Sequence, residues 1–489
     1  QNPKEYFEKI ASQGILLDPK QRKAEILAQA NQLAAEVGGH VGQETDLQDE
    51  VTNLVEVPTA FRGQFDESYL EVLPPEVLIS VMKKHQRYFV VKDNQGQLMP
   101  YFIGVRNGGE KHLETVIDGN EQVILARFDD ATFFVKKDLQ QPLENFVDDL
   151  DTLTFEVKLG SFLEKTVRIT ALVKSLGARL KLSKEEMQIT QRAAKLCKAD
   201  LATNMVVEMT SLQGVMGRYY ALHSGEKSEV ADAIFEHYLP RSADDKSPET
   251  KPGLVVGLAD RLDSLIGLFA VGLAPTGTKD PFALRRAALG ICQNLMAWEI
   301  ELDLRWALEE AAGQLTVDAS EQDREGCLAF IQRRLRGMLL DKGFNYDVVD
   351  AVLAEEGQNP YGTFLGVQAL SAWVERQDWG KILPAFSRCV RIIRDLDEVY
   401  QVDESLLVEE SEKLLYEAVT GAEQAMAGVE KVDAFLNAFL PMVPVVNRFF
   451  DEVLVMAEDD AVRENRLALC QRIAGLSEGA ADLSCLEGF

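Results

Sequence analysis

The sequence contains few of the residues that build metal and redox centres. Its 489 residues include 5 histidines and 6 cysteines, and no two cysteines have the spacing of a CxxC pair. Cysteines scattered in this way are typical of free thiols in a reducing cytosol, and they lack the ligand pattern of structural zinc. We therefore expect a cytoplasmic protein whose own residues hold no metal.

Motifs that bind nucleotides or activate a serine are also missing. The sequence has no GxxxxGK[ST], no GxGxxG and no GxSxG, so it predicts neither a phosphate-cradling loop nor a nucleophile elbow. No apolar run reaches the ~18 residues that a membrane-spanning helix needs. These absences exclude the common nucleotide-binding and serine-hydrolase sites and argue against a membrane protein.

Positive charge is scarce. Lysine and arginine number 51 against 79 acidic residues, which gives a formal net charge of −28. A field of that sign repels nucleic acid at long range, so the composition excludes a generally basic coat protein. Selective RNA binding would then require local clusters of arginine. A chain of this length also predicts two to four domains.

Helical periodicity dominates the sequence outside one mixed segment, from about residue 46 to 155. Within it, residues 86–92 and 98–105 are apolar and aromatic runs around a turn, which predicts a β-hairpin. Asn120 is expected to cap a helix that follows the hairpin. From about residue 156 onward the pattern is almost entirely helical. The predicted fold is therefore mainly α and multidomain, with one mixed α/β module near the N-terminus.

The string Lys181-Leu182-Ser183-Lys184 resembles the Lys-x-Ser-Lys signature of class I aminoacyl-tRNA synthetases. Ser183 is followed three residues later by Glu186, which is the spacing of a capping box at a helix start. No HIGH-type partner sequence is present. We therefore favour a helix cap over a catalytic loop.

Two helices resemble those that hold the metal in HD-type phosphohydrolases. In GLADRLDSL (257–265) Asp260 stands at a ligand position, and in AAKLCKADLAT (193–203) the paired His-Asp is replaced by Ala199-Asp200. Two carboxylates without the histidine would hold a hard cation weakly and no water-activating metal. We expect the fold without the metal, with Asp200 and Asp260 as vestigial positions that cap a helix end or enter a buried ion pair.

The string TKDPFALRRAALG (278–290) resembles a hallmark of the β subunit of bacterial heterotetrameric glycyl-tRNA synthetase. Further segments resemble that family in the same order: DEVTNLVEVP (49–58), MKKHQRYF (82–89), IDGNEQV (117–123), ARFDDATFF (126–134), LATNMVVEMTSLQGVMGRYYA (201–221), GEKSEVADAI (225–234), EHYLPR (236–241) and FFDEVLVMAEDDAVRENRLALC (449–470). The resemblance runs over essentially the whole chain. Members of the family also carry a substantial N-terminal part, which we expect this chain to lack.

The resemblance implies a subunit that recognises and positions tRNA(Gly) without performing the chemistry. ATP, Mg²⁺ and the class II catalytic site are then expected in a partner α subunit, in an α2β2 assembly, with no cofactor in this chain. It also implies four parts: a mixed α/β module with a helical lead-in (1–155), a degenerate HD-like helical domain (156–275), a helical linker domain (276–378) and a DALR-type anticodon-binding helical domain (379–489).

Arginines gather at three places that could contact RNA, in residues 331–342, in residues 277–290 and in the last domain (379–489), since a guanidinium takes phosphate oxygens bidentately and stacks on unpaired bases. The candidate residues for tRNA binding are Arg333 and Arg334, then Arg388, Arg391 and Arg394, then Arg463, Asn465 and Arg466, and finally His85 and Arg87 in the hairpin. Arginine on a helix more often makes a solvated ion pair. For the hairpin the alternative is core packing, with Tyr88 and Phe89 against Phe133 and Phe134.

A structural hinge is the favoured interpretation of Asp280, Arg285 and Arg286, in which the arginines tie a helix start to Asp280 or to another domain. Two competing functions stay open. One is an HD-type metal-dependent phosphohydrolase, and the other is a helical scaffold without an RNA role.

Overall fold

The computed structural model describes residues 3–242, 245–428 and 431–489, and it divides the chain into two compact units. Unit 1 comprises residues 1–155, 160–167 and 188–235, and unit 2 comprises residues 156–159, 168–187 and 236–489. The structure is mainly helical, as predicted. No helix in the described part of the chain combines the length and the apolar character that a bilayer crossing requires.

The elements up to the boundary near residue 236 are α1 (Pro3–Ser12), α2 (Pro19–Ala35), β1 (His40–Val41), α3 (Thr45–Leu54), β2 (Pro58–Gln64), α4 (Ser68–Val72), α5 (Pro75–Ser80), the π-helical turn η1 (Val81–His85), β3 (Phe89–Lys92), β4 (Leu98–Asn107), α6 (Leu113–Asp138), the 3-10 turns η2 (Leu143–Phe146) and η3 (Asp148–Thr152), β5 (Thr154–Glu156), β6 (Gly160–Ser161), α7 (Phe162–Arg179), α8 (Lys184–Leu196), η4 (Ala199–Ala202), α9 (Asn204–Glu208), η5 (Thr210–Leu212), α10 (Val215–His223) and α11 (Ser228–Glu236).

The elements that follow are α12 (Lys251–Ala270), α13 (Leu284–Ala297), α14 (Leu304–Ala312), α15 (Glu321–Asp341), α16 (Tyr346–Glu356), α17 (Pro360–Val374), α18 (Trp379–Ile393), η6 (Glu404–Leu406), α19 (Glu410–Met426), α20 (Val432–Phe439), η7 (Leu440–Met442), α21 (Val443–Glu452), α22 (Asp460–Gly475) and η8 (Leu483–Cys485).

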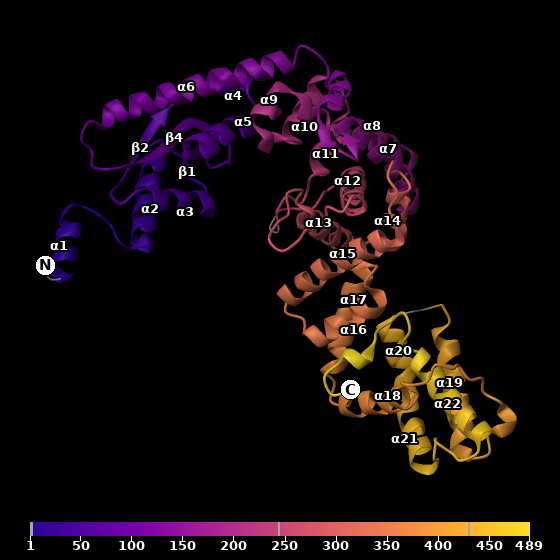
Figure 1. The fold of residues 1–489 in the computed structure, drawn as a ribbon. Helices are drawn as coiled ribbons and strands as arrows, with labels where there is room; N and C mark the ends of the chain where they lie inside the picture. Colours follow the sequence, from indigo (N-terminus) through magenta and orange to yellow (C-terminus); the bar gives the residue numbers. More distant parts are fainter. Residues whose placement is uncertain (1–2, 243–244, 429–430) are drawn as a thin grey trace. The chain divides into compact units, whose positions relative to one another are not determined.

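Unit 1 contains the mixed α/β module. Its four-stranded antiparallel sheet has the order β1-β3-β4-β2, with α2 and α3 on one face and α6 on the other (Figure 1). Alternation along the strands directs Phe89, Val91 and Ile103 into the core beneath α2. On the other face, Phe128 of α6 meets the ring of Phe65 edge-on at 5.0 Å.

The predicted hairpin is confirmed as β3 and β4, with a register shift between Val90 and Lys92. The first strand begins at Phe89 rather than residue 86, because Arg87 has a left-handed φ of 57° that breaks the extended backbone.

The predicted cap at Asn120 is wrong. Helix α6 begins at Leu113, and Asn120 lies inside it. Its side-chain amide donates to the carbonyl of Val116 at 2.6 Å, while its side-chain oxygen accepts from the Tyr88 hydroxyl. An asparagine whose side chain has these partners is tolerated within a helix.

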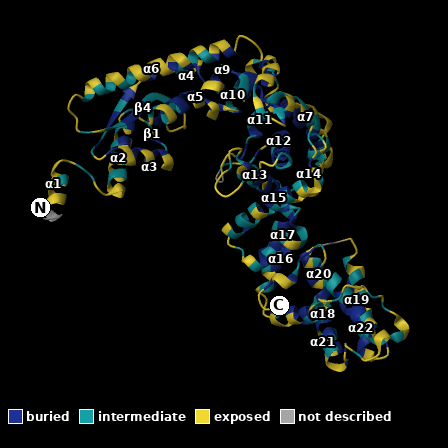
Figure 2. Cartoon of the chain, in the orientation of Figure 1, coloured by how far each residue is buried: buried dark blue, intermediate teal, exposed yellow. Residues whose placement is uncertain are grey.

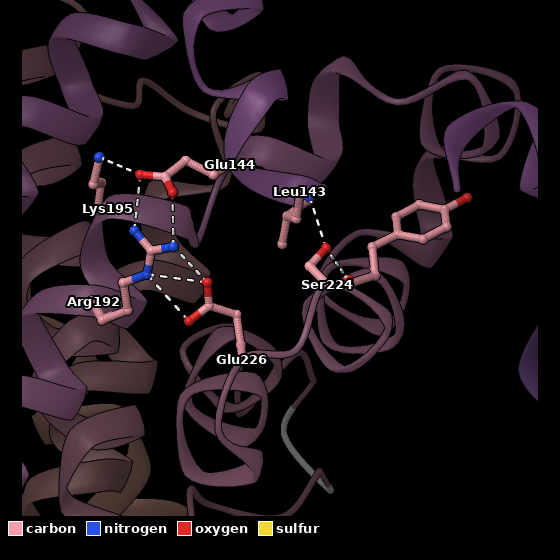
Figure 3. A network of polar contacts seen from close by, with 7 residues as sticks. Leu143, Glu144, Arg192, Lys195, Ser224 and Glu226 are labelled. Atoms are coloured by element: carbon pink, nitrogen blue, oxygen red, sulfur yellow. Dashed lines mark hydrogen bonds and ion pairs between the residues drawn. The ribbon is translucent and has the colours of Figure 1, made fainter. Parts of the chain in front are cut away.

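A network of ion pairs joins segments of unit 1 that are far apart in the sequence (Figure 3). Arg192 of α8 lies between Glu144 and Glu226 and donates to both, with Nη1 2.9 Å from Glu144 Oε1 and Nη2 2.5 Å from Glu226 Oε1. Lys195 adds a contact to Glu144 at 2.6 Å. Hydrogen bonds from Arg192 and Lys195 lower the pKa of Glu144 to about 2.

Helix α12 forms the centre of the helices that follow in unit 2. Residues on all its sides are buried, and Figure 2 shows most of its length as buried, which is typical of a helix surrounded by others. Two buried arginines fix it. Arg168 of α7 pairs with Asp263 at 2.6 Å, and Arg261 donates to the carbonyls of His237 at 2.8 Å and Leu239 at 2.7 Å.

Candidate nucleic-acid interface

Three arginines follow one side of α18, and we call them the α18 arginine row (Arg388, Arg391, Arg394). The opposite side of the helix buries Ile382, Phe386 and Cys389, so amphipathic packing orients the row away from the core. Arg394 is the residue directly after the last helical one.

The members of the row differ in how far their guanidinium groups are already engaged. Arg388 is half-buried, lies 4.5 Å from the centre of the Phe450 ring and donates to Asn447 at 3.4 Å. Arg391 is exposed and donates to the backbone carbonyl of Phe489. Arg394 is exposed, and within the described residues its side chain has no ion pair or hydrogen bond. The row therefore offers most free donors at its C-terminal end.

The arginines of α22 are bound within the protein. Arg463 pairs with Asp460 at 2.5 Å and donates to the carbonyl of Ala457 at 3.1 Å. Arg466 pairs with Glu412 of α19 at 2.5 Å, where the two side chains are 12% and 1% exposed. These contacts favour the ion-pair interpretation for both arginines, and most strongly for the buried Arg466.

Asn465 is 4% exposed and clamps a distant backbone segment. Its side-chain oxygen accepts from the Asp403 amide at 2.6 Å, and its side-chain nitrogen donates to the Asp403 carbonyl at 3.1 Å. The side-chain oxygen and nitrogen of Asn465 are therefore both engaged within the protein, which leaves few hydrogen-bonding groups for contact with the edge of a base.

Arg333 and Arg334 lie in the middle of α15, beside the ring of Phe330. The centres of their guanidinium groups are 5.9 Å and 4.6 Å from that ring. Burial and the charges of Arg285 and Arg333 lower the pKa of Arg334. These two residues are thus brought together with an arginine of the α13 start.

Asp280 caps the first turn of α13. Its two carboxylate oxygens accept from the amides of Leu284 at 2.9 Å and Arg285 at 3.0 Å, and Arg285 Nη1 lies 3.8 Å from Asp280 Oδ2. The expected contact between Arg285 and Asp280 is present, whereas Arg286 is exposed without an ion pair in the described residues. The hinge role stays a prediction.

His85 and Arg87 are exposed at the start of the hairpin, and Arg87 pairs with Glu50 at 2.5 Å. Next to them, Tyr88 stacks on Phe102 with ring centres 4.5 Å apart, and burial raises its pKa to about 12. Phe133, which we expected to cover this pair, is 62% exposed. Tyr88 therefore packs against an aromatic ring, but that ring is Phe102 of β4 and not Phe133 of α6.

Asp200 and Asp260, the two aspartates that the sequence analysis compared with HD-type ligand positions, lie in different units. Asp200 in η4 is fully buried, and its Oδ2 accepts from the amides of Gly214 at 2.6 Å and Gly217 at 3.0 Å at the start of α10. Its Oδ1 is buried and has no hydrogen bond to any residue that the structure describes, and burial raises the pKa of the carboxyl to about 6. Asp260 is half-buried within α12. No group of three or more His, Cys, Asp and Glu in the described ranges could hold a metal ion.

Known proteins match this chain over nearly its whole length. A family model described as glycyl-tRNA synthetase beta subunit matches residues 1–354, and one described as DALR anticodon binding domain matches residues 382–482. The glycine–tRNA ligase beta subunits of Desulforamulus reducens and Clostridioides difficile are 43% and 41% identical. They cover 99% and 98% of this chain, which spans 70% of each of them. The chain belongs to the glycyl-tRNA synthetase β-subunit family.

A longer plant relative matches the same region. Glycine–tRNA ligase, chloroplastic/mitochondrial 2, from Arabidopsis thaliana is 38% identical over 100% of this chain and 46% of its own length. These shares show that the relatives contain further residues. The expected absence of an N-terminal part therefore stays a prediction.

The family assignment separates the candidate residues into two regions. The α18 arginine row, Arg463, Asn465 and Arg466 fall in the part that matches the anticodon-binding domain, whereas Arg333, Arg334, His85 and Arg87 fall in the part that matches the β-subunit model. Sequence reasoning missed Glu412, Phe450 and Phe489, the partners of these arginines. Of these three residues, only Glu412 could have been singled out from the sequence. It stands three residues after Glu409, the spacing of a capping box, and the structure has that box at the start of α19.

Proposed function

We propose that this chain binds and positions tRNA(Gly) for glycylation at the active site of an α subunit, in an α2β2 assembly. The names of the relatives and the anticodon-binding match support RNA recognition. In this proposal ATP and Mg²⁺ act in the α subunit in the cytoplasm, and this chain contributes binding surface.

The proposal extends to the domain organisation. We assign a mixed module to residues 1–155, a degenerate HD-like domain to 156–275, a linker domain to 276–378 and the anticodon-binding domain to 379–489. The buried Asp200, held by two backbone amides, supports an HD-like helical core in which this position is structural.

The α18 arginine row is the observation that carries RNA binding. It lies in the anticodon-binding match, and its last two members are exposed: Arg394 has no ion pair or hydrogen bond in the part of the chain that the structure describes, and Arg391 donates to the main-chain oxygen of Phe489. A planar guanidinium donates two parallel hydrogen bonds to phosphate and stacks on unpaired bases, so this pair suits an RNA loop.

Filter binding of tRNA(Gly) tests this assignment. The double variant Arg391→Gln plus Arg394→Gln is expected to bind about 10-fold or more weakly, since each contact contributes about 1–3 kcal/mol. Much of the preference over a tRNA with a substituted anticodon should also disappear. Arg448→Gln is the matched control, because Arg448 is also exposed but pairs with Glu452 at 2.8 Å.

Two results would contradict the proposal. If the wild-type chain binds tRNA(Gly) no more tightly than a tRNA with a substituted anticodon, the scaffold alternative is favoured. A double variant that binds both RNAs like the wild type would remove the α18 arginine row from the interface.

A further inference from the structure

A second group of arginines in unit 2 lies outside the anticodon-binding match, and we call it the α13–α15 arginine cluster (Arg285, Arg286, Arg333, Arg334). Arg285 and Arg286 stand in the first turn of α13, and Arg333 and Arg334 in the middle of α15. The two helices pack against each other, as Figure 1 also shows.

The helix segments around the cluster lack acidic residues. Residues 281–298 and 326–340 contain no aspartate or glutamate, although the chain has 79 acidic residues among 489. Asp280 lies 3.8 Å from Arg285 and also acts on Arg334. Arg286 and Arg333 form no ion pair with any described residue. Three positive charges, those of Arg285, Arg333 and Arg334, therefore gather near one carboxylate, which already caps α13, and Arg286 adds a fourth charge on the same first turn of α13.

The guanidinium of Arg334 packs against an aromatic ring, but one of its hydrogen-bond donors has no acceptor among the described residues. It lies 4.6 Å from the centre of the Phe330 ring, which is 3% exposed, and its Nε is buried without a hydrogen-bond acceptor among the described residues. The charges of Arg285 and Arg333 act on the same guanidinium. An anion bound at the outer nitrogens of these arginines would reduce their mutual repulsion.

We propose that the α13–α15 arginine cluster binds the phosphodiester backbone of tRNA, apart from the anticodon contact. The proposal rests on the function proposed above. Successive phosphates of one strand supply several negative charges at short spacing, which matches four guanidinium groups on two adjacent helices. A contact to phosphates positions the RNA without reading its sequence. In a chain of net charge −28, two adjacent helix segments without acidic residues offer a place where a nucleic acid can approach.

The test measures the salt dependence of tRNA(Gly) binding to the full chain. Two variants probe the cluster, the double variant Arg333→Gln plus Arg334→Gln and the single variant Arg286→Gln, whose exposed side chain can be replaced without harm to folding. Arg336→Gln is the matched control on the same helix, because Asp350 already holds that guanidinium through contacts of 2.5 Å and 2.8 Å.

We expect the slope of log K against log salt to become shallower by about 0.7–0.9 for each phosphate contact removed. Affinity should fall by the same factor for tRNA(Gly) and for a tRNA with a substituted anticodon. Arg336→Gln should retain the wild-type slope.

An unchanged slope in both cluster variants would overturn the inference. Variants that keep the slope but no longer retain the α subunit would overturn it as well, since the cluster would then contact an acidic protein surface. A wild-type chain without preference for tRNA(Gly) would instead contradict the proposed function, and this result is separate from any effect of the cluster variants.

Discussion

Single side chains with the same charge have different environments in this protein. Arg394 is exposed and lacks a partner in the described ranges, whereas Arg466 is nearly buried against Glu412. A buried ion pair that loses one member leaves the other charge without compensation, which costs about 3–5 kcal/mol. Exposed pairs contribute about 0–1 kcal/mol.

The variant Arg466→Met should therefore destabilise the C-terminal helices strongly. We expect a loss of about 3–5 kcal/mol in the free energy of unfolding, because Glu412 would stay buried without its guanidinium. Arg463→Met, which breaks a pair with the 79%-exposed Asp460, should cost under about 1 kcal/mol. Urea denaturation followed by circular dichroism measures both, and equal losses would contradict the structural role of Arg466.

Asp200 predicts a pH dependence of stability. Burial raises the pKa of its carboxyl from 3.8 to about 6, against the opposing effects of the Gly214 amide and Lys198. Between these pH values the folded state binds a proton that the unfolded state has released, so the contribution of Asp200 to stability falls as pH rises from about 4 to 6.

The comparison variant is Asp200→Asn, which does not titrate. The difference in unfolding free energy, wild type minus variant, should fall by up to about 3 kcal/mol between pH 4 and 6, at ~1.4 kcal/mol per unit, and stay constant above pH 7. Urea titrations across this range provide the measurement. A difference that rises with pH would show that the carboxylate, and not the acid, is stabilised by folding.

The environments of these residues could be predicted only in part. The sequence has Ala199 where a His-Asp pair would have histidine, and this favoured a capping or ion-paired Asp200 over a metal ligand. In the structure Asp200 accepts from two backbone amides. It does not show that Arg466 meets Glu412, because the two residues are 54 positions apart and the contact depends on how α19 and α22 pack. Charge spacing on one helix locates candidates for RNA binding, but the partner on another helix decides which guanidinium groups are free.

At the scale of elements, local signals were reliable where a turn or a cap is complete within a few residues. The hairpin of β3 and β4 and the capping box at Ser183 are both present, with Ser183 accepting from the Glu186 amide at 3.2 Å and its amide donating to the Glu186 carboxylate at 2.7 Å. The prediction for the start of α6 was wrong because Asn120 lies inside the helix, where its side-chain oxygen accepts from the hydroxyl of Tyr88, a tertiary contact that local sequence does not reveal.

The capping box gives a prediction for α8. Ser183→Ala removes the acceptor for the Glu186 amide and should cost about 1 kcal/mol. Ser183→Asp keeps an acceptor at the same place and should stay within a few tenths of the wild type. Hydrogen exchange of the amides in the first turn of α8 is the measurement, and equal protection in both variants would contradict a role for this cap.

At the scale of the whole molecule, the family could be recognised from the sequence because its motifs are many and ordered along the chain. The mainly helical class followed from periodicity, and the antiparallel sheet from one hairpin. Beta strands β1 and β2 were not predicted, because each is short or interrupted by glycine. Gly63, for example, faces the Phe102 ring so closely that an added Cβ would lie 2.3 Å from it.

The central claim is that this chain supplies RNA recognition while a separate α subunit supplies the chemistry. Glycylation of tRNA(Gly) tests it most directly, measured with the α subunit alone, with this chain alone and with both together. We expect glycyl-tRNA only from the combined subunits and no aminoacyl-adenylate from this chain alone. Adenylate formation or glycyl-tRNA from this chain alone, or equal glycylation by the α subunit with and without it, would contradict the account.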